Sequence, residues 1–199
     1  TARVAGPAGP LGGVTPGQYR RGGAGLELAH VTIATRFGDL RVAATDRGVA
    51  FVAFGSPEAT LAELEAEFPA ARLVAGCGDH PALGEWAAAI EAHLDGRRPD
   101  PRLPLDVHGT AFQRLVWDLL VSIPAGRTLS YAALAQAIGR PGAARAAASA
   151  CAANRIALLI PCHRVIRGDG ALGGYRWGLP VKRALLAAEG ALAAAGAAA

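Results

Sequence analysis

Ile160-Pro161-Cys162-His163-Arg164-Val165 is the stretch around which the rest of the chain is organised. It closes the apolar run 156–160 and precedes the glycine-rich segment 167–175. A thiol beside an imidazole, where a buried element meets a loop, can be a nucleophile with its base close by. Only the thiolate attacks, and a nearby histidine or positive charge lowers the thiol pKa towards neutrality. Taken alone, such a pair is more often a small core cysteine beside a hydrogen-bonded loop histidine.

The flanking sequence favours the nucleophile, because it contains further motifs. These are Gly109-Thr110-Ala111-Phe112-Gln113, Ile123-Pro124-Ala125-Gly126, Ser130-Tyr131, Ser149-Ala150-Cys151-Ala152-Ala153-Asn154, segment 170–177 and Leu185-Leu186-Ala187-Ala188-Glu189. Together with Pro161-Cys162-His163-Arg164-Val165 they resemble the methylated-DNA–protein-cysteine methyltransferases, the O6-alkylguanine repair family. The resemblance is strongest to the C-terminal half of the bacterial Ada-type members. It is strong over about residues 105–190 and continuous, though weaker, back to about residue 15.

Composition bounds the possible classes of protein. The 199 residues can form one domain or two small ones, and a hydrophobic content of 52% is ample for a core. Asn154 and Arg155 interrupt the longest apolar run, and no secretory signal is visible, so we expect no membrane association. Three widely spaced cysteines do not form a disulfide framework, which fits a reduced, cytoplasmic and nucleoid-associated protein.

Charge is divided unevenly along the chain. From Thr110 onward there are ten basic and three acidic residues, whereas residues 1–109 contain ten basic and thirteen acidic residues. A basic C-terminal half predicts contact with a polyanion such as DNA. A generally arginine-rich composition explains why nearly all the basic residues are Arg, but not the difference between the halves.

The N-terminal segment 1–25 is rich in Gly and Pro and predicts a flexible stretch. Within it, residues 13–21 resemble the end of an AraC-type helix-turn-helix domain, which precedes the alkyltransferase half in Ada-type proteins. We therefore expect a regulatory domain, with a zinc-bound cysteine domain before it, to belong to a longer protein of which this chain is a part. That protein would be a bifunctional repair protein and transcriptional regulator.

Alternating apolar and polar residues predict three strands, at 28–34, 39–45 and 49–54. The turns Phe37-Gly38 and Arg47-Gly48 are short, so the strands should form an antiparallel meander. Two helices should follow, one between Pro57 and Pro69 and one at about 81–94, before the proline-rich linker 97–104. The fold class is then α+β, and the resemblance implies that residues 26–100 form a ribonuclease H-like α/β domain without catalytic residues.

The C-terminal domain, 105–190, should be mostly helical. Apolar spacing predicts a helix over 110–122 with Thr110 as its N-cap, a helix from Ser130 to Ile138, and a third over about 143–153. Two helices joined by a short glycine-containing turn form a helix-turn-helix, and the resemblance implies a winged variant. We expect the tail 191–199 to be disordered.

The third helix consists almost entirely of alanine. One interpretation is a good helix former in a crowded core. The other is a small-residue surface that approaches the minor groove, which is about half as wide as the major groove and offers little base-specific information. This second interpretation suits a repair protein, which must scan every sequence.

The resemblance assigns roles to individual residues. It makes Cys162 the alkyl acceptor and His163 the base that acts on the thiol through a water molecule, with Glu189 orienting and charging the imidazole. Asn154, eight residues before Cys162, ties the DNA-binding helix to the active-site turn. Arg145 corresponds to the finger that replaces a flipped-out base, although it could be an ordinary phosphate contact. Ala144, Ala146 and Ser149 share its DNA-contacting helix, and Tyr131, Val165, Tyr175 and Arg176 line the alkyl pocket.

The implied reaction transfers a methyl or larger alkyl group from O6-alkylguanine, and from O4-alkylthymine, irreversibly to Cys162. We expect one turnover per molecule, no cofactor and no metal site, with a monomer bound to the minor groove of double-stranded DNA and the damaged base flipped out. Two alternatives stay open. One is a regulatory DNA-binding fragment, and the other is a damage-binding protein without transfer activity, against which the intact Cys162 argues.

Overall fold

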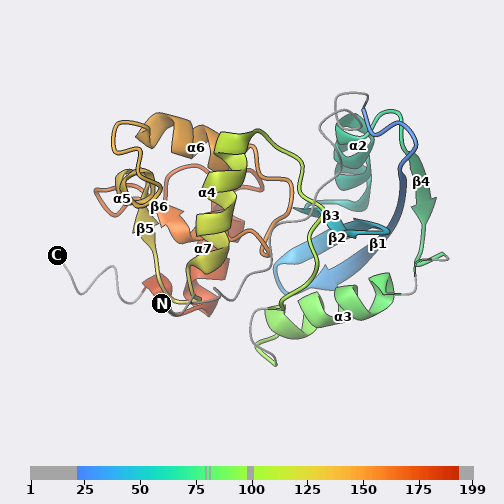
Figure 1. Cartoon of the computed structure of the whole chain (residues 1–199). Coiled ribbons are helices and arrows are strands. Elements are labelled where there is room, and N and C mark those ends of the chain that lie inside the picture. Colours follow the sequence, from blue (N-terminus) through green and yellow to red (C-terminus); the bar gives the residue numbers. More distant parts are fainter. Residues whose placement is uncertain (1–21, 79, 81, 98–100, 193–199) are drawn as a thin grey trace, which may run out of the picture.

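The computed structural model describes residues 22–78, 80, 82–97 and 101–192, and within them the chain has an α+β fold. Figure 1 shows a sheet with two helices on the right and a mainly helical part on the left. The sheet part contains β1–β4, α2 and α3. The helical part contains α4–α7, the short strands β5 and β6, and one 3-10 turn.

The four-stranded sheet has the order β3-β2-β1-β4. β1 (Glu27–Thr35), β2 (Gly38–Thr45) and β3 (Gly48–Phe54) form the predicted antiparallel meander, which is confirmed. The fourth strand, β4 (Arg72–Ala75), pairs in parallel with β1 and was not predicted. Its four residues are too few to show an alternating pattern, and each pairs with a residue 45 positions earlier in the chain, as Arg72 does with Glu27.

α2 (Pro57–Glu67) and α3 (Leu83–Leu94) cover opposite faces of this sheet. Leu64 of α2 belongs to a cluster with Phe51, whereas Ile90 of α3 belongs to a cluster with Val52. Because successive side chains of a strand point to opposite faces, neighbouring residues of β3 enter different clusters. Helices in both regions were predicted. α3 begins at Leu83, and Pro81, where its start was expected, lies outside the described residues.

The helical part follows its sequence signals closely. α4 (Ala111–Ser122) begins at a capping box, in which the Thr110 side chain accepts from Gln113 N and the Gln113 side chain accepts from Thr110 N. α5 (Tyr131–Ala137) is capped by Ser130. The remaining elements are β5 (Leu129–Ser130), α6 (Ala144–Ala152), the 3-10 turn η1 (Cys162–Arg164), β6 (Val165–Ile166) and α7 (Leu179–Ala188).

The two parts share one hydrophobic core. A single buried cluster includes Val52 of the sheet, Ile90 of α3, Val116 of α4 and Ile156 before the active-site turn. Val52 N donates to Arg155 O, and Ala157 N donates to Val52 O, both at 2.9 Å. The outer edge of β3 is thereby covered by the segment that leads to Cys162.

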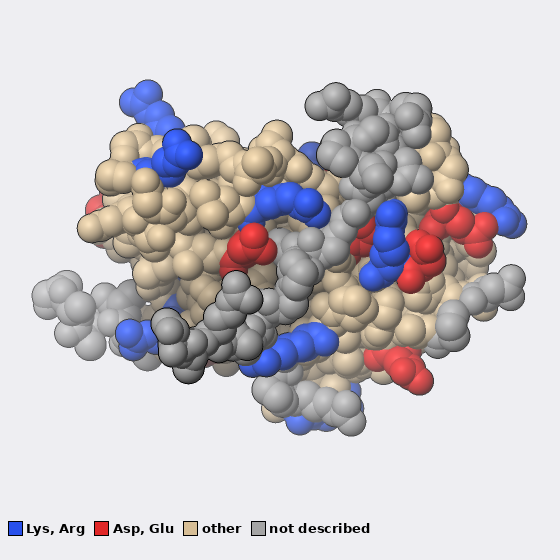
Figure 2. Space-filling model, in the orientation of Figure 1, with Lys and Arg blue, Asp and Glu red and all other residues tan. Residues whose placement is uncertain are grey.

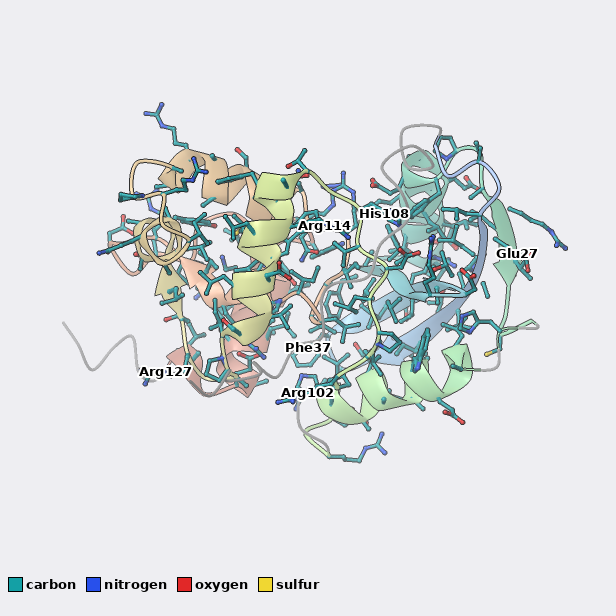
Figure 3. All side chains as sticks on the ribbon, in the orientation of Figure 1. Glu27, Phe37, Arg102, His108, Arg114 and Arg127 are labelled. Carbon is teal, nitrogen blue, oxygen red and sulfur yellow. The ribbon has the colours of Figure 1, made fainter. Side chains whose placement is uncertain are left out.

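Polar contacts reinforce this junction. Arg155 Nε lies 2.5 Å from Glu67 Oε2, and Arg176 Nε lies 2.8 Å from Glu63 Oε1, so α2 forms ion pairs with two segments of the helical part. Figure 3 shows His108 and Arg114 between the two parts, and Arg114 Nη2 donates to Val107 O at 3.1 Å. The sheet part is therefore fixed against the segments that flank the active-site turn.

A few described residues near the two ends of the chain make defined contacts. Residues 22–25, assigned to a flexible segment, form a turn in which Gly22 O accepts from Ala70 N at 2.8 Å; the rest of that segment lies outside the described residues. Ala191, assigned to a disordered tail, is 3% exposed because it packs into the protein, and residues 193–199 of the tail lie outside the described residues. Among the described residues, no helix combines the length and apolar character that a bilayer span requires.

Candidate active site

Asn154 holds together the turn that precedes Cys162. Its Nδ2 donates to Ile160 O at 2.8 Å, to Ile156 O at 3.3 Å and to Cys162 Sγ at 3.2 Å, while its Oδ1 accepts from Ile156 N at 2.8 Å. The side chain is 1% exposed. Leu158, in the middle of the turn, has a φ of 68°, a conformation that is uncommon for a side chain of this kind and is found where the surroundings impose it.

Cys162 begins the 3-10 turn η1 and is almost completely buried. Burial raises the pKa of its thiol, while the hydrogen bond from Asn154 and the charges of Lys182 and Arg176 act in the opposite direction. In the free protein burial outweighs these influences, so the pKa of the Cys162 thiol lies above its ordinary value. The thiol needs a proton acceptor when it reacts.

His163 and Glu189 form a direct pair. His163 Nε2 lies 2.9 Å from Glu189 Oε1, and the histidine is 1% exposed. A carboxylate at this distance keeps the proton on Nε2, which makes Nδ1 the basic nitrogen of the neutral ring. Burial would raise the pKa of Glu189, but hydrogen bonds and charges from His163 and Arg164 outweigh it and lower the pKa to about 2.

Arg164 is a third, buried member of this cluster. Its Nη2 donates to Glu189 Oε1 at 2.8 Å and its Nε donates to Oε2 at 3.1 Å, while Nη1 donates to Ile123 O at 2.6 Å. Gly126 comes close on the other side, with φ +79°, and a Cβ there would lie 2.9 Å from Glu189 O. The end of α4 and the end of α7 are therefore joined through Arg164 and Glu189.

Lys182 of α7 is a buried lysine behind the glycine-rich loop. Its Nζ donates to Val165 O at 2.6 Å, Leu172 O at 2.5 Å and Gly174 O at 3.2 Å, so each of the three ammonium protons has a carbonyl acceptor. Burial lowers its pKa to about 8, although the nearby thiols Cys162 and Cys151 favour the charged form. The ammonium fixes the loop against β6.

The residues predicted to line the alkyl pocket differ in their position relative to the Cys162 thiol. β5 pairs in parallel with β6, matching Ser130 with Ile166, and this brings Tyr131 towards the active-site turn. Burial, with the thiols Cys151 and Cys162 nearby, raises the pKa of Tyr131 to about 12. The Tyr175 ring lies 6.3 Å from the His163 ring, edge to face.

Val165 and Arg176 differ in their surroundings. Val165 is fully buried in β6, whereas Arg176 is exposed and paired with Glu63 of α2. The hydroxyl of Tyr175 is buried and has no hydrogen-bond partner in the described part of the chain. An orphaned donor beside the thiol is suited to a ligand that brings an acceptor.

The predicted DNA-contacting residues lie on one side of α6. Arg145, Ala146 and Ser149 are exposed and Ala144 is half-buried, whereas Ala147 and Ala150 are buried. The inner face of α6 therefore packs in the core, as the first interpretation of the alanine-rich helix expects, and its outer face meets solvent. On the face shown in Figure 2, acidic side chains gather mostly on the right-hand, sheet-containing part.

The structure brings Asn154, Cys162, His163 and Glu189 together, and places Arg145 on the exposed side of α6. Sequence reasoning did not assign roles to Arg164 and Lys182. Both carried a signal, since Arg164 stands inside the quoted motif and Lys182 is the only lysine in the chain. Isolated buried charges require partners, which is why a lone lysine on an apolar helix face is informative.

Comparisons with known proteins agree with this geometry. Residues 111–191 match the family described as "6-O-methylguanine DNA methyltransferase, DNA binding domain". The inducible methylated-DNA–protein-cysteine methyltransferase of Bacillus subtilis (strain 168) is 39% identical over 152 residues, which cover 74% of this chain and 82% of that protein. The chain belongs to the methylated-DNA–protein-cysteine methyltransferase family.

Within this family the chain is also similar to a longer protein. The bifunctional transcriptional activator/DNA repair enzyme Ada of Escherichia coli (strain K12) is 45% identical over 181 residues, covering 89% of this chain and 49% of Ada. The chain thus spans about half the length of this relative. Among solved structures, the O6-methylguanine methyltransferase of Mycobacterium tuberculosis has a TM-score of 0.67 and 34% identity over 82% of this chain and 93% of that one.

Proposed function

We propose that this protein repairs DNA by transferring the alkyl group of O6-alkylguanine, and of O4-alkylthymine, to the sulfur of Cys162. The observation that carries the proposal is the buried thiol within 3.2 Å of Asn154 Nδ2, next to the hydrogen-bonded pair His163–Glu189. These groups can stabilise a thiolate and accept its proton, as nucleophilic catalysis by a cysteine requires. The chemical inertness of the thioether product supports a single turnover per molecule.

The proposed transfer is a displacement at carbon. The sulfur of Cys162 forms a bond to the alkyl carbon while the bond from that carbon to guanine O6 breaks, and the electron pair leaves with the guanine. His163 takes the thiol proton through a water molecule, and Glu189 stabilises the imidazolium that forms. The leaving guanine anion accepts a hydrogen bond from the Tyr131 hydroxyl, which the raised pKa keeps protonated.

We further propose that α6 enters the minor groove of double-stranded DNA. A methyltransferase of this family, M. tuberculosis OGT, has been solved in complex with DNA and has a TM-score of 0.67 to this chain. The exposed side of α6 carries Arg145, Ala146 and Ser149, with Ala144 beside them, so its backbone can come close to a narrow groove. Arg145 would fill the gap that the flipped base leaves, at an unstacking cost of a few kcal/mol.

We also propose a finer description of the fold and of the alkyl pocket. Residues 26–100 form a ribonuclease H-like domain, and residues 105–190 form a winged helix-turn-helix alkyltransferase domain in which α5 and α6 are the paired helices. Val165, Tyr175 and Arg176, with Tyr131, line the alkyl pocket. The protein acts as a monomer, within an Ada-like repair and regulatory protein, and the similarity to Ada over 89% of this chain supports that assignment.

The test uses duplex DNA that contains one O6-methylguanine with a radioactive methyl group. The wild-type protein and C77A should each take up label without added cofactor, saturating near one methyl per molecule, whereas C162A should take up none. C77A is the matched control because Cys77 is an exposed cysteine outside the site. A folded, DNA-binding protein that takes up no label would refute the transfer and favour a regulatory or damage-binding role, and repeated turnover would contradict the assigned thiol chemistry.

A further inference from the structure

Glu189 accepts hydrogen bonds from two neighbouring side chains, His163 and Arg164. In a base-and-orienter pair of the familiar kind, the carboxylate acts on the histidine alone. Here Oε1 of Glu189 accepts from His163 Nε2 at 2.9 Å and from Arg164 Nη2 at 2.8 Å, and Arg164 Nε also lies 3.1 Å from Oε2. The arginine therefore holds both carboxylate oxygens, and the histidine shares one of them.

Because these three side chains are buried, the sharing of Glu189 affects the charge of His163. The side chains of His163 and Arg164 are 1% and 3% exposed and that of Glu189 is 11% exposed, so solvent screens their charges poorly. A lone buried carboxylate would strongly favour the protonated imidazole. A carboxylate that is paired with a guanidinium favours the protonated imidazole much less, because the positive charge of the arginine repels the added proton.

We propose that Arg164 is a positioning residue that anchors Glu189 to the end of α4 and offsets part of its charge, so that His163 stays neutral and able to accept the thiol proton near neutral pH. This inference rests on the proposed function, because it gives His163 the role of base. The anchoring comes from Arg164 Nη1, which donates to Ile123 O at 2.6 Å. The titratable or charged groups that the described contacts place at His163 are Cys162 and Arg164 on its own turn, Glu189 at the end of α7 and Tyr175 from the loop, and Lys182 of α7 acts on the adjacent Cys162.

Tyr175 and Lys182 differ from Arg164 in their charge or in their hydrogen-bond partners. Burial raises the pKa of Tyr175 well above its usual range, so its hydroxyl carries no charge. Lys182 is directed away to three carbonyl oxygens of β6 and the loop. Arg164 is consequently the cation that shares an oxygen with His163, and changing it should act on the histidine directly.

The experiment measures His163 itself. Protein labelled with ¹³C at the histidine Cε1 is titrated by NMR without DNA, as wild type, R164Q and R164K. Removing the positive charge in R164Q should raise the midpoint of His163 protonation by about one pH unit or more. R164K keeps a charge beside Glu189 and should leave the midpoint within a few tenths of a unit of wild type. Single-turnover methyl transfer is then measured against pH, and the acid limb of R164Q should move upward with the midpoint.

Each alternative result is distinguishable. If Arg164 only supports the structure, R164Q and R164K will lower the transfer rate by the same factor at every pH and leave the midpoint in place, which overturns the proposal. The NMR titration does not depend on transfer, so an inactive wild-type protein would refute the proposed function while still testing the charge offset. If R164Q does not fold by circular dichroism, R164M replaces it: the loss of the positive charge should again raise the midpoint, and an unchanged midpoint would overturn the proposal.

Discussion

Asn154 Nδ2 lies 3.2 Å from Cys162 Sγ, across eight positions of the sequence. The same amide donates to Ile160 O and Ile156 O, and its Oδ1 accepts from Ile156 N. One side chain therefore closes the turn and touches the nucleophile. Its hydrogen bond favours the thiolate, in opposition to burial, which raises the pKa of the thiol.

Replacing Asn154 should harm both folding and transfer. In N154A several buried groups lose their partner, which should lower the free energy of unfolding by about 2–3 kcal/mol, measured by urea denaturation. In N154D the size is kept but a donor becomes an acceptor that faces Ile160 O and the sulfur, so the transfer rate should fall about tenfold or more. The exposed Gln136 provides a control, because Q136A should change neither quantity. An N154D protein with the wild-type rate would contradict the role of this amide.

Glu189 should make stability depend on pH in the acid range. The hydrogen bonds from His163 and Arg164 hold its pKa at about 2 in the folded protein, against an ordinary value of 4.5. The folded pKa is the lower one, so the stabilisation is complete above about pH 4.5 and is lost as pH falls towards 2. The loss should be on the order of 2–3 kcal/mol in urea titrations of wild type, and largely absent in E189Q. E85Q, at an exposed glutamate, should behave as wild type; an E189Q curve that falls equally steeply would rule this explanation out.

Lys182 should control the order of the glycine-rich loop. In K182M the carbonyls of Val165, Leu172 and Gly174 lose their donor, so amides of residues 168–174 should exchange with deuterium at least about tenfold faster, with a lower transfer rate. R183M is the control, because Arg183 is the exposed neighbour on the same helix. Equal exchange in both variants would show that the ammonium does not hold the loop.

Lys182 should also make the free energy of unfolding depend on pH in the alkaline range. Burial lowers its pKa to about 8, below the ordinary 10.5, so the unfolded chain binds more protons than the folded protein between these values. The contribution of Lys182 to the free energy of unfolding therefore rises with pH from about 8 to 10.5. Chemical denaturation of wild type and K182M across this range should differ in slope, the wild type being the steeper. Parallel curves would contradict the shifted pKa.

Arg145 should matter for duplex substrates and not for folding. It is exposed on α6, so R145A should change the free energy of unfolding by no more than about 0.5 kcal/mol. If the proposed base flipping occurs, transfer from O6-methylguanine in duplex DNA should fall about tenfold or more, because no side chain would fill the gap, while reaction with the free base should be unchanged. The exposed Arg72 on β4 is the matched control. A loss that is equal for free base and duplex would remove the finger role from Arg145.

Local structure was largely predictable because its determinants are local. Alternation predicted the three strands of the meander, and Thr110 and Ser130 predicted the starts of α4 and α5 through their side-chain caps. β4 was missed, because four residues carry little periodicity and its parallel pairing with β1 is a long-range contact. The contact of Gly22 O with Ala70 N likewise joins distant parts of the chain, and a glycine-rich stretch reveals nothing about such a partner.

The sequence by itself determined the family resemblance, the helices with their caps, and which residues could carry the chemistry, because these depend on residue type and spacing along the chain. Only the tertiary structure decided that burial raises the pKa of Cys162, that Arg164 shares Glu189 with His163, and that the ammonium of Lys182 holds the loop. It also decided that β3 of the sheet pairs with the segment before the active-site turn. Burial and charge sharing depend on groups that meet only when distant parts of the chain pack together, and no local pattern encodes which partner each buried charge will find.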